Sequence, residues 1–415
     1  MKTPEIANAW ETRPAAASST SDPDLPAIGR ARVAVICDFL EEHWPSMDLA
    51  GDMLCRYLAE NGGAGFVPAQ MRPSLHRRFS RLPFLPRRLA RNADLLINRF
   101  GDYPLWLRGK RRDYDLFHLV DHSYGQLIHG LPPRRTVVTC HDLDTFRCLL
   151  EPEREMRPGW FRAMTRRILG GFRQAAHVIA VSEATRSDLL RHGLFPPERI
   201  SVVHNGVHPS CSALPDLKAD AEAARLLPGD RPGAVSLLNV GSTLPRKRLD
   251  WLLRVFAAVR QQIPEARLVR VGGGFTKMQL QLASKLGVER SIVILPFLDR
   301  NILAAVYRRA AVLLHTAEAE GFGLPILESM ACGCPVVASD VAVLREVGAA
   351  AATYCRLDNL DDWKATVTGL VRERTQDPRA WELRRQRGVA QSARFTWAEN
   401  ARQTAAVYRK ILEND

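Results

Sequence analysis

Two glutamates flank a glycine-rich turn in the segment HTAEAEGFGLPILESMACGCPVVAS, which covers residues 315–339. Glu320 and Glu328 are separated by seven residues. Two carboxylates in one cleft can act as the acid and base of a glycosidase, or they can hold a sugar. An acidic residue near a helix start is also stabilising without a ligand, which explains Glu328 alone better than it explains the pair. A metal site is a poorer interpretation, because no His or Asp joins the glutamates at ligand spacing.

A basic run opens a second candidate loop, NVGSTLPRKRLD at 239–250. Gly241 and Ser242 follow a predicted strand, whereas Arg246 and Lys247 stand at the entrance of a predicted helix. Backbone N–H groups at a helix start, together with nearby cations, suit a phosphate or diphosphate. Cations at a helix N-terminus oppose the helix dipole by about 0.3–1 kcal/mol each. Their presence there therefore favours an anionic ligand over a plain surface helix.

A third loop, RVGGGFTKM, contains Gly272 and Gly273 directly after a predicted strand. It resembles part of a dinucleotide fingerprint but lacks the G-x-G-x-x-G spacing, so the signal is weak by itself. The glycines indicate that the backbone passes close to a nucleotide or to the next helix. Phe297 follows another predicted strand and is a further candidate contact for a nucleotide.

The first half of the chain has two histidines that each follow a strand, His122 and His141. Both are predicted to point toward the same cleft, although a lone histidine is more often structural. Asp142 and Asp144 form a D-x-D pattern like the one that holds a metal in another class of sugar transferase. A pattern of three residues arises easily by chance and carries little weight.

Ten short β-branched runs, each followed by a helical pattern, must position these residues. Apolar strands that alternate with helices indicate parallel sheets covered on both faces, and ligands bind beyond the carboxyl ends of such strands. Five runs lie on each side of the loop at 209–220, so we expect two doubly wound, Rossmann-like α/β domains. The predicted strands are 33–37, 115–120, 136–140, 177–182, 200–205, 235–240, 266–271, 291–296, 311–316 and 335–340.

Composition narrows the class of protein. The 415 residues are 46% hydrophobic without a membrane-length apolar run, and the eight cysteines show no framework, which favours reduced thiols in the cytosol. The formal net charge is +13, and basic residues crowd into 72–112 among Leu, Phe and Trp. Nucleic acid, an anionic membrane, a phosphorylated acceptor or a merely solvated face would each explain that segment.

The stretch from Glu320 to Glu328, followed by ESMACGCPVVASD, closely resembles the E-x7-E motif of the retaining glycosyltransferases of family 4. These enzymes have the GT-B fold, in which two Rossmann-like domains face each other across a cleft. Further segments are similar to the family in the same order, over roughly residues 115–415. They are AAHVIAVSEATRSDLLRHGLFPPERISVVHNGV, NVGSTLPRKRLDWLLRVF, LVRVGGG and FTWAENARQTAAVYRKIL.

The resemblance implies a role for each matching residue. Lys247 would contact the donor diphosphate, Glu328 the ribose hydroxyls, and Glu320 the transferred sugar. His141 would reach the sugar near the reacting carbon, so His141, Glu320 and Lys247 form the implied catalytic set. The remaining implied contacts are Gly241, Ser242, Arg246, Phe322, Gly323 and Leu324 for sugar and diphosphate, Gly272, Gly273 and Phe297 for the nucleotide, and Ser46, Asp48 and His122 for the acceptor.

The chain departs from the family pattern at two places. Ser242 stands where the family usually has an arginine, and Arg246 is expected to supply the charge instead. Ser46, Met47 and Asp48 occupy the region of a frequent Gly-Gly pair.

The resemblance also implies the domain plan. Residues 30–208 form the acceptor domain and 209–395 the donor domain, with the helix at 396–415 crossing back to the first. Residues 1–29 are predicted to be a disordered lead, because they are polar and Pro-rich and have no apolar core of a signal peptide.

We therefore expect a cytoplasmic, metal-independent, retaining glycosyltransferase that needs no cofactor beyond its nucleotide-sugar donor. Its acceptor would be a saccharide or a lipid-linked sugar of surface polysaccharide or glycolipid assembly. The basic segment 72–112 is predicted to contact an anionic membrane leaflet. A nucleotide-sugar epimerase or a sugar phosphorylase of the same fold is the first alternative. A non-catalytic protein that binds nucleotides or nucleic acid is a distant one, because the basic residues cluster outside the motif loops.

Overall fold

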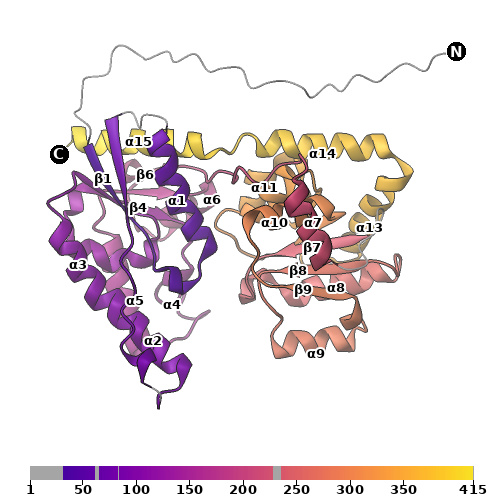
Figure 1. Ribbon diagram of the computed structural model, residues 1–415, viewed down its shortest axis with the longest axis horizontal. Helices are drawn as coiled ribbons and strands as arrows, with labels where there is room; N and C mark the ends of the chain where they lie inside the picture. Colours follow the sequence, from indigo (N-terminus) through magenta and orange to yellow (C-terminus); the bar gives the residue numbers. More distant parts are fainter. Residues whose placement is uncertain (1–30, 61–64, 83, 228–234, 415) are drawn as a thin grey trace, which may run out of the picture.

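The computed structural model describes residues 31–60, 65–82, 84–227 and 235–414, so the predicted lead at 1–29 lies outside the described residues. Two α/β domains stand side by side, each built on a parallel sheet of six strands (Figure 1). The last two helices run along one side of both domains. This architecture confirms the predicted fold class.

The first sheet has the strand order β2-β1-β3-β4-β5-β6, and the second has the order β12-β11-β10-β7-β8-β9. All strand pairs are parallel, as in the register Val33–Leu116 between β1 and β3. The strands of the first sheet are β1 (Ala31–Ile36), β2 (Phe66–Met71), β3 (Leu116–Leu119), β4 (Thr136–Cys140), β5 (His177–Ala180) and β6 (Ile200–Val202). Those of the second are β7 (Ser236–Val240), β8 (Arg267–Val271), β9 (Ile292–Leu295), β10 (Val312–His315), β11 (Val336–Ser339) and β12 (Thr353–Cys355).

The ten predicted strands are confirmed, but the count of five per sheet was wrong by one in each sheet. The two missed strands, β2 and β12, both lie at sheet edges. β2 contains Pro68, which argues against a central strand but is tolerated at an edge. β12 has only three residues, too few for a visible pattern.

The helices cover both faces of each sheet. Alternate residues of β1 show this, because Val33 and Val35 pack under α1 and α15, whereas Ala34 and Ile36 belong to the opposite core. The helices are α1 (Pro45–Glu60), α2 (Arg87–Ile97), α3 (Tyr103–Lys110), α4 (Arg147–Leu150), α5 (Gly159–Phe172), α6 (Glu183–Arg191), α7 (Leu217–Leu226), α8 (Leu249–Arg260), α9 (Lys277–Lys285), α10 (Arg300–Arg309), α11 (Leu324–Ala331), α12 (Ala342–Gly348), α13 (Leu360–Gln376), α14 (Pro378–Ser392) and α15 (Trp397–Glu413).

The chain crosses between the domains twice. The first crossing follows β6, and the second joins α14 of the second domain to α15, which packs on the first (Figure 1). Tyr408 of α15 is buried there, with its hydroxyl 2.6 Å from Nδ1 of His118 in β3. Asn400 adds a hydrogen bond to the carbonyl of His204 in the first crossing. The Asn400 bond thereby ties the two crossings together.

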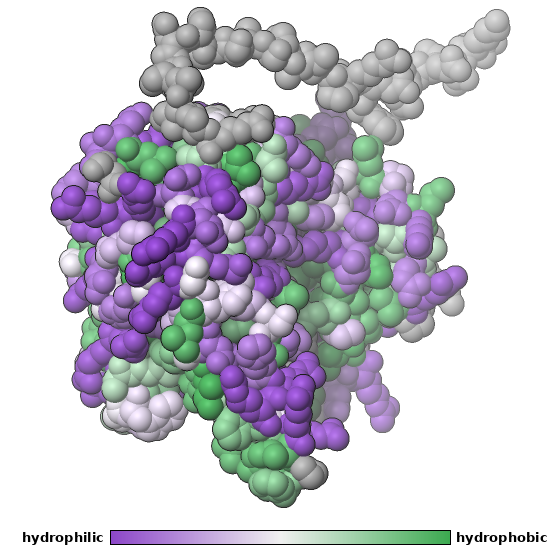
Figure 2. All heavy atoms as spheres, turned by 60° about the vertical axis from the view of Figure 1, so that its left-hand side comes forward, coloured by the Kyte–Doolittle hydropathy of each residue, from purple (hydrophilic) through white to green (hydrophobic). Residues whose placement is uncertain are grey.

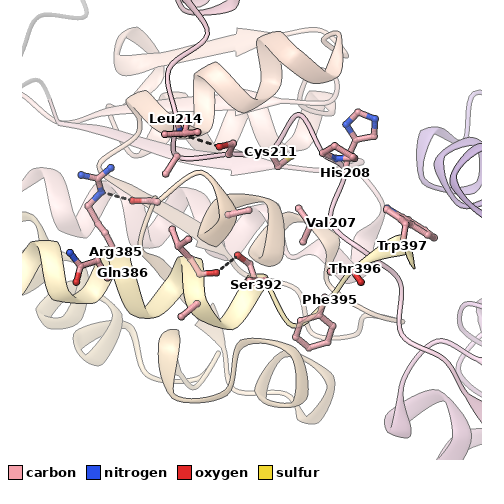
Figure 3. A pocket seen from close by; sticks show the side chains of 18 of the residues that line it. Val207, His208, Cys211, Leu214, Arg385, Gln386, Ser392, Phe395, Thr396 and Trp397 are labelled. Carbon is pink, nitrogen blue, oxygen red and sulfur yellow. Dashed lines mark hydrogen bonds between the residues drawn. The ribbon is translucent and has the colours of Figure 1, made fainter. Parts of the chain in front are cut away.

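A cavity of about 1090 Å³ lies between the two crossings and α14 (Figure 3). Val207 and Leu214 line it from the first crossing, Phe395 and Trp397 from the second, and Arg385 from α14. None of the predicted donor or acceptor residues contributes to its wall. It is therefore a feature of the linker side of the molecule and separate from those residues.

Among the described residues, no helix combines the length and the apolar character needed to cross a membrane.

Candidate active site in the cleft between the domains

The predicted site residues lie where strands of both sheets end. In the second domain, Gly241 follows β7, Gly272 follows β8, and the glycine elbow follows β10. In the first domain, His141 directly follows β4. Because carboxyl ends of parallel strands share one edge of a sheet, each domain presents its loops on a single side. The two sets of loops meet where Gly321 contacts His141 and where Arg246 contacts Asp142.

Glu320 is held between cations. Its carboxylate pairs with the ammonium group of Lys247, and Oε2 lies 3.4 Å from NH1 of Arg246. Nε2 of His315 donates to Oε1 over 2.8 Å, and the Glu320 side chain is only 7% exposed. Burial raises the pKa of Glu320, but Lys247, His315 and Arg246 together lower it by more than burial raises it. The pKa of Glu320 therefore falls well below its usual range. Glu320 is thus a fixed carboxylate and not a general acid.

The basic loop has the geometry needed to present its cations. Pro245–Lys247 form one turn of 3-10 helix, and Arg248, at φ 47°, begins α8. The Thr316 hydroxyl donates to the carbonyl of Lys247 over 3.0 Å, which fastens this loop to the strand end before Glu320. The loop and the glutamate elbow therefore form one rigid unit.

Ser242 carries no charge toward the cleft, but a buried arginine supports its backbone. Arg270, inside β8, donates to the carbonyl oxygens of Gly241 at 2.6 Å and Ser242 at 3.0 Å. Gly272 presses on the same loop, since a Cβ there would lie 2.3 Å from the Gly241 carbonyl oxygen. Gly272 thus serves close packing of two loops. A Cβ at Gly273 would meet nothing within 4 Å, and Phe297 is 59% exposed, so both residues lie at the surface.

Glu328 lies inside α11 and is not part of the cluster that Arg246 and Lys247 form with Glu320. The hydroxyl of Tyr307 donates to its Oε2 over 3.0 Å. Burial raises the pKa of Glu328 to about 7, although Tyr307 and Arg300 act in the opposite direction. Glu328 therefore changes charge near neutral pH, in contrast to Glu320.

The glycine elbow touches the first domain directly. A Cβ at Gly321 would lie 1.8 Å from the carbonyl oxygen of His141, so only glycine fits this contact. The hydroxyl of Ser182 donates to the Gly321 carbonyl over 2.8 Å. Gly323, at φ 101°, then begins α11 with no side chain capping it. Pro325 has no N–H and the N–H of Ile326 donates to the carbonyl of Gly323, which leaves the N–H of Leu324 for a ligand. The structure thus brings His141 and the Glu320 elbow together.

His141 is fixed in one tautomer by its neighbours. Its Nε2 lies 2.9 Å from the carbonyl oxygen of Val120, which can only accept, so Nε2 carries the proton. Burial lowers the pKa of His141. The ring is therefore neutral, with Nδ1 as an acceptor.

The flanking residues of the elbow differ in what they offer. The ring of Phe322 packs against His204 and Phe395, with centroids 5.9 and 6.0 Å apart, so only its backbone is free for a ligand. Leu324 packs against the cores of both domains. Backbone contacts from these two positions to a donor stay a prediction.

The prediction that His122 contacts the acceptor was wrong. Its ring is 3% exposed and packs against Phe146 and Phe172 at 5.5 and 6.1 Å. Its Nδ1 lies 3.3 Å from Asp121 and 3.4 Å from the N–H of His141. His122 follows β3, as predicted, but its ring turns into the core because aromatic neighbours enclose it there.

Ser46 and Asp48 both lie in the first turn of α1. Ser46 is exposed, whereas Asp48 pairs with Arg72 at 3.1 Å. Arg300 of the second domain donates to the carbonyl of Pro45 over 3.4 Å. The first turn of α1 therefore contacts the second domain.

The described part of the chain contains no group of three or more His, Cys, Asp or Glu side chains that could hold a metal ion. Asp142 and Asp144, the D-x-D pair, face Arg246 across the cleft instead.

Two family models match consecutive parts of the chain. Residues 52–210 match the model described as Glycosyltransferase Family 4, and residues 229–386 match that of Glycosyl transferases group 1. The chain belongs to the family 4 glycosyltransferases. The resemblance of the E-x7-E segment to that family is thereby confirmed.

Curated relatives of this glycosyltransferase include a D-inositol 3-phosphate glycosyltransferase of Thermobispora bispora. It is 34% identical over 245 residues, which are 56% of this chain and 55% of the relative, so the match spans about half the length of that protein. The O-antigen chain mannosyltransferase B of Escherichia coli is 27% identical over 312 residues, or 74% of this chain and 78% of the relative.

Solved structures share the fold of this glycosyltransferase. Sucrose-phosphate synthase of Thermosynechococcus elongatus has a TM-score of 0.67 at 19% identity, covering 93% of this chain and 100% of its own. HepE of Anabaena, solved in complex with UDP and glucose, has a TM-score of 0.66 at 16% identity, covering 91% and 99%. At these identities the likeness supports the fold and no more.

Several residues of the site were not predicted from the sequence. His315 supports Glu320, Arg270 supports the basic loop, and Tyr307 supports Glu328. Arg270 had a visible signal, because a charged residue inside an apolar strand is rarely buried without a partner. Tyr307 had none, since an aromatic residue on a helix is usually part of the core.

Proposed function

We propose that this glycosyltransferase moves a hexose from a nucleoside diphosphate sugar to a hydroxyl group of a saccharide or lipid-linked acceptor, with retention of configuration. One observation carries the proposal: Glu320 is fixed as a carboxylate between Lys247 and His315, in an elbow packed against His141. The transferases among the relatives support it, and the alternatives of an epimerase, a phosphorylase or a nucleic-acid-binding protein find no support there.

The chemistry follows from where negative charge develops. When the sugar leaves its nucleoside diphosphate, charge grows on the departing phosphate, and oriented donors stabilise it. Lys247 and the uncapped N–H group of Leu324 are the donors available for it. The sugar carbon becomes oxocarbenium-like, and the acceptor hydroxyl attacks the face from which the phosphate leaves. The departing phosphate takes the hydroxyl proton, so no separate base is required.

The two glutamates then divide the donor between them. Glu320, which stays ionised, accepts hydrogen bonds from sugar hydroxyls, and Glu328 accepts them from the ribose. His141 offers its unprotonated Nδ1 to a hydroxyl of the same sugar, and its contact with Gly321 keeps it beside the elbow. Positioning of this kind is worth several kcal/mol when the reacting atoms are held in line.

No metal or other cofactor is part of the proposal. Lys247 supplies at the phosphate the positive charge that a divalent ion supplies in other transferases. Transfer is therefore expected to proceed at an unchanged rate in EDTA. A chelator-sensitive rate that Mg²⁺ restores would contradict this part of the proposal.

The acceptor side is proposed to meet a membrane surface. The segment 72–112 folds into the tip of the first domain around α2 and α3, and Figure 2 shows apolar side chains gathered at this tip beside hydrophilic ones. Phe84 is 75% and Leu89 60% exposed. Arg87 and Arg88 are exposed and form no ion pair within the described residues. Basic and apolar side chains on one protrusion suit an anionic leaflet and a lipid-linked acceptor.

The reaction is tested with purified protein, a panel of uridine, guanosine and adenosine diphosphate sugars, and extracts that contain glycolipid and polysaccharide acceptors. Release of a nucleoside diphosphate that depends on the extract is expected with one donor of the panel. NMR of the product is expected to show the anomeric configuration of the donor. Inverted configuration, or conversion of the donor without an acceptor, would contradict the proposal.

A further inference from the structure

The D-x-D pair has a partner on the opposite side of the cleft. Arg246 of the second domain donates from NH2 to Oδ2 of Asp142 over 3.2 Å, and its Nε lies 2.8 Å from Oδ2 of Asp144 in an ion pair without a hydrogen bond. Its NH1 lies 3.1 Å from the carbonyl oxygen of Ala319 and 3.4 Å from Glu320. Every nitrogen of the guanidinium group therefore lies within 3.2 Å of a protein oxygen. In this arrangement Asp142 and Asp144 lie against NH2 and Nε, so a phosphate that binds these nitrogens must displace the aspartates.

The charges on the two sides of the cleft are complementary. On the second-domain side, Arg246, Lys247 and Glu320 sum to one positive charge. On the first-domain side, Asp144 also pairs with Arg147, so the two aspartates and that arginine sum to one negative charge. The first domain thus presents to Arg246 a pair of anionic oxygens, which is also what a diphosphate presents. Both cannot occupy the same guanidinium nitrogens.

We propose that Asp142 and Asp144 are positioning residues that hold Arg246 and compete with the donor diphosphate for it. The proposal rests on the proposed function, namely that a nucleoside diphosphate sugar binds beside Lys247. Because the aspartates follow β4 and Arg246 precedes α8, opening of the cleft separates them. The donor then takes over Arg246, and release of the product lets the aspartates return.

A local feature shows that the aspartates are built for this position. The N–H of Asp144 donates to Oδ1 of Asp142 over 3.0 Å, so a tight turn holds both carboxylates on one side. Burial and the neighbouring Asp142 raise the pKa of Asp144, although Arg246 and Arg147 act against this. The pair is therefore under mutual repulsion that Arg246 relieves. An asparagine at either position keeps the turn and removes the charge.

The test is isothermal titration calorimetry of the full chain with UDP, GDP and ADP. Asp142→Asn/Asp144→Asn is compared with the wild type and with Asp358→Asn/Asp361→Asn, a matched pair of neutralised aspartates in exposed ion pairs with Arg356 and Lys364. The single variant Asp144→Asn covers the case in which the double variant does not fold. Asp144→Glu keeps the charge.

We expect the preferred nucleotide to bind the double variant about fivefold to tenfold more tightly than the wild type, as for loss of one competing ion pair. Asp144→Asn should show a smaller gain in nucleotide affinity. Asp144→Glu and the surface-control variant should bind the nucleotide with the wild-type Kd. A Kd that is unchanged or weaker in the folded neutralised variants would overturn the competition, and equal tightening in Asp144→Glu would do so too. If no nucleotide binds the wild type or any variant, the proposed function itself fails.

Discussion

Lys247 and Glu320 are the residues on which the proposed chemistry depends most. Lys247→Ala removes the cation nearest the expected phosphate, and loss of one such group typically lowers turnover by about 10²–10³-fold. Glu320→Gln keeps the shape of the side chain but loses its pairing with Lys247, and we expect a loss of about 10²-fold from misplacement of the sugar. Initial rates with the preferred donor measure both effects. Lys364→Ala on α13, a partly exposed lysine paired with Asp361, is the matched control and should leave the rate unchanged.

Glu328 gives the site a pH dependence of its own. Its pKa of about 7 means that most molecules carry a protonated Glu328 at pH 6 and an ionised one at pH 8. Because the carboxylate accepts from ribose hydroxyls better than the acid does, nucleotide affinity should rise by up to about tenfold over this range. Glu328→Gln should lack this component, and the nucleotide's own ionisation cancels in the comparison.

The same pKa has a consequence for stability. A carboxyl group whose pKa is raised on folding binds more protons in the folded than in the unfolded chain, so it stabilises below its unfolded pKa and this contribution is lost as pH rises toward 7. The melting temperature of the wild type should therefore fall relative to that of Glu328→Gln between pH 5 and pH 7.5. If the melting temperatures of the two proteins change equally with pH, Glu328 is not buried as described.

At the scale of elements, the glycine elbow between β10 and α11 sets how closely the domains meet. Gly321→Ala would place a Cβ 1.8 Å from the His141 carbonyl oxygen, so the elbow and His141 must move apart. We expect turnover to fall more than about tenfold, since misplacement by about 1 Å has such an effect, while the nucleotide Kd stays within about threefold. Gly369→Ala on α13, where a Cβ meets nothing within 4 Å, is the control.

Equal loss of affinity and turnover in Gly321→Ala would contradict this account, because the nucleotide contacts all lie within the second domain.

The tip formed by α2 and the turn before it is the element proposed to meet the membrane. Phe84→Ser/Leu89→Ser should weaken binding to vesicles with anionic lipid at least severalfold, because each exposed apolar side chain contributes on insertion. Co-sedimentation with anionic and neutral vesicles measures it. Leu217→Ser on α7, an even more exposed leucine of the other domain, is the control. Equal binding of the wild type to both kinds of vesicle would contradict an electrostatic contribution.

The elements were predictable where the sequence pattern is strong. Continuous apolar runs such as the one in β10 leave little choice but a buried parallel strand, whereas β2, with Pro68 and Gln70, does not show that pattern. The direction of a side chain beyond a strand end was not predictable. His122 and His141 both follow strands, yet His122 turns into the aromatic core and His141 toward the elbow. Pattern places a residue at an edge, but its neighbours decide which way it points.

At the scale of the whole molecule, contacts across the cleft were beyond prediction, because they join segments far apart in the chain. Arg246 meets Asp142 and Asp144 from more than 100 positions away, and nothing local to either segment signals the other. The same holds for His204 and Glu346, whose side chains lie 2.7 Å apart on the linker side. The family motif predicts two domains that face each other, but only the three-dimensional structure shows which residues of the two domains touch.

The central claim is that this cleft binds a nucleoside diphosphate sugar through Lys247. Thermal denaturation of the wild type and of Lys247→Ala, with uridine, guanosine and adenosine diphosphates and their sugars, tests it most directly. The account predicts that one nucleotide and its sugar raise the melting temperature of the wild type, since a ligand bound only to the folded state stabilises it. It also predicts that Lys247→Ala, folded and melting as a single transition, loses most of this increase. No increase with any nucleotide in the wild type, or an equal increase in both proteins, would contradict it.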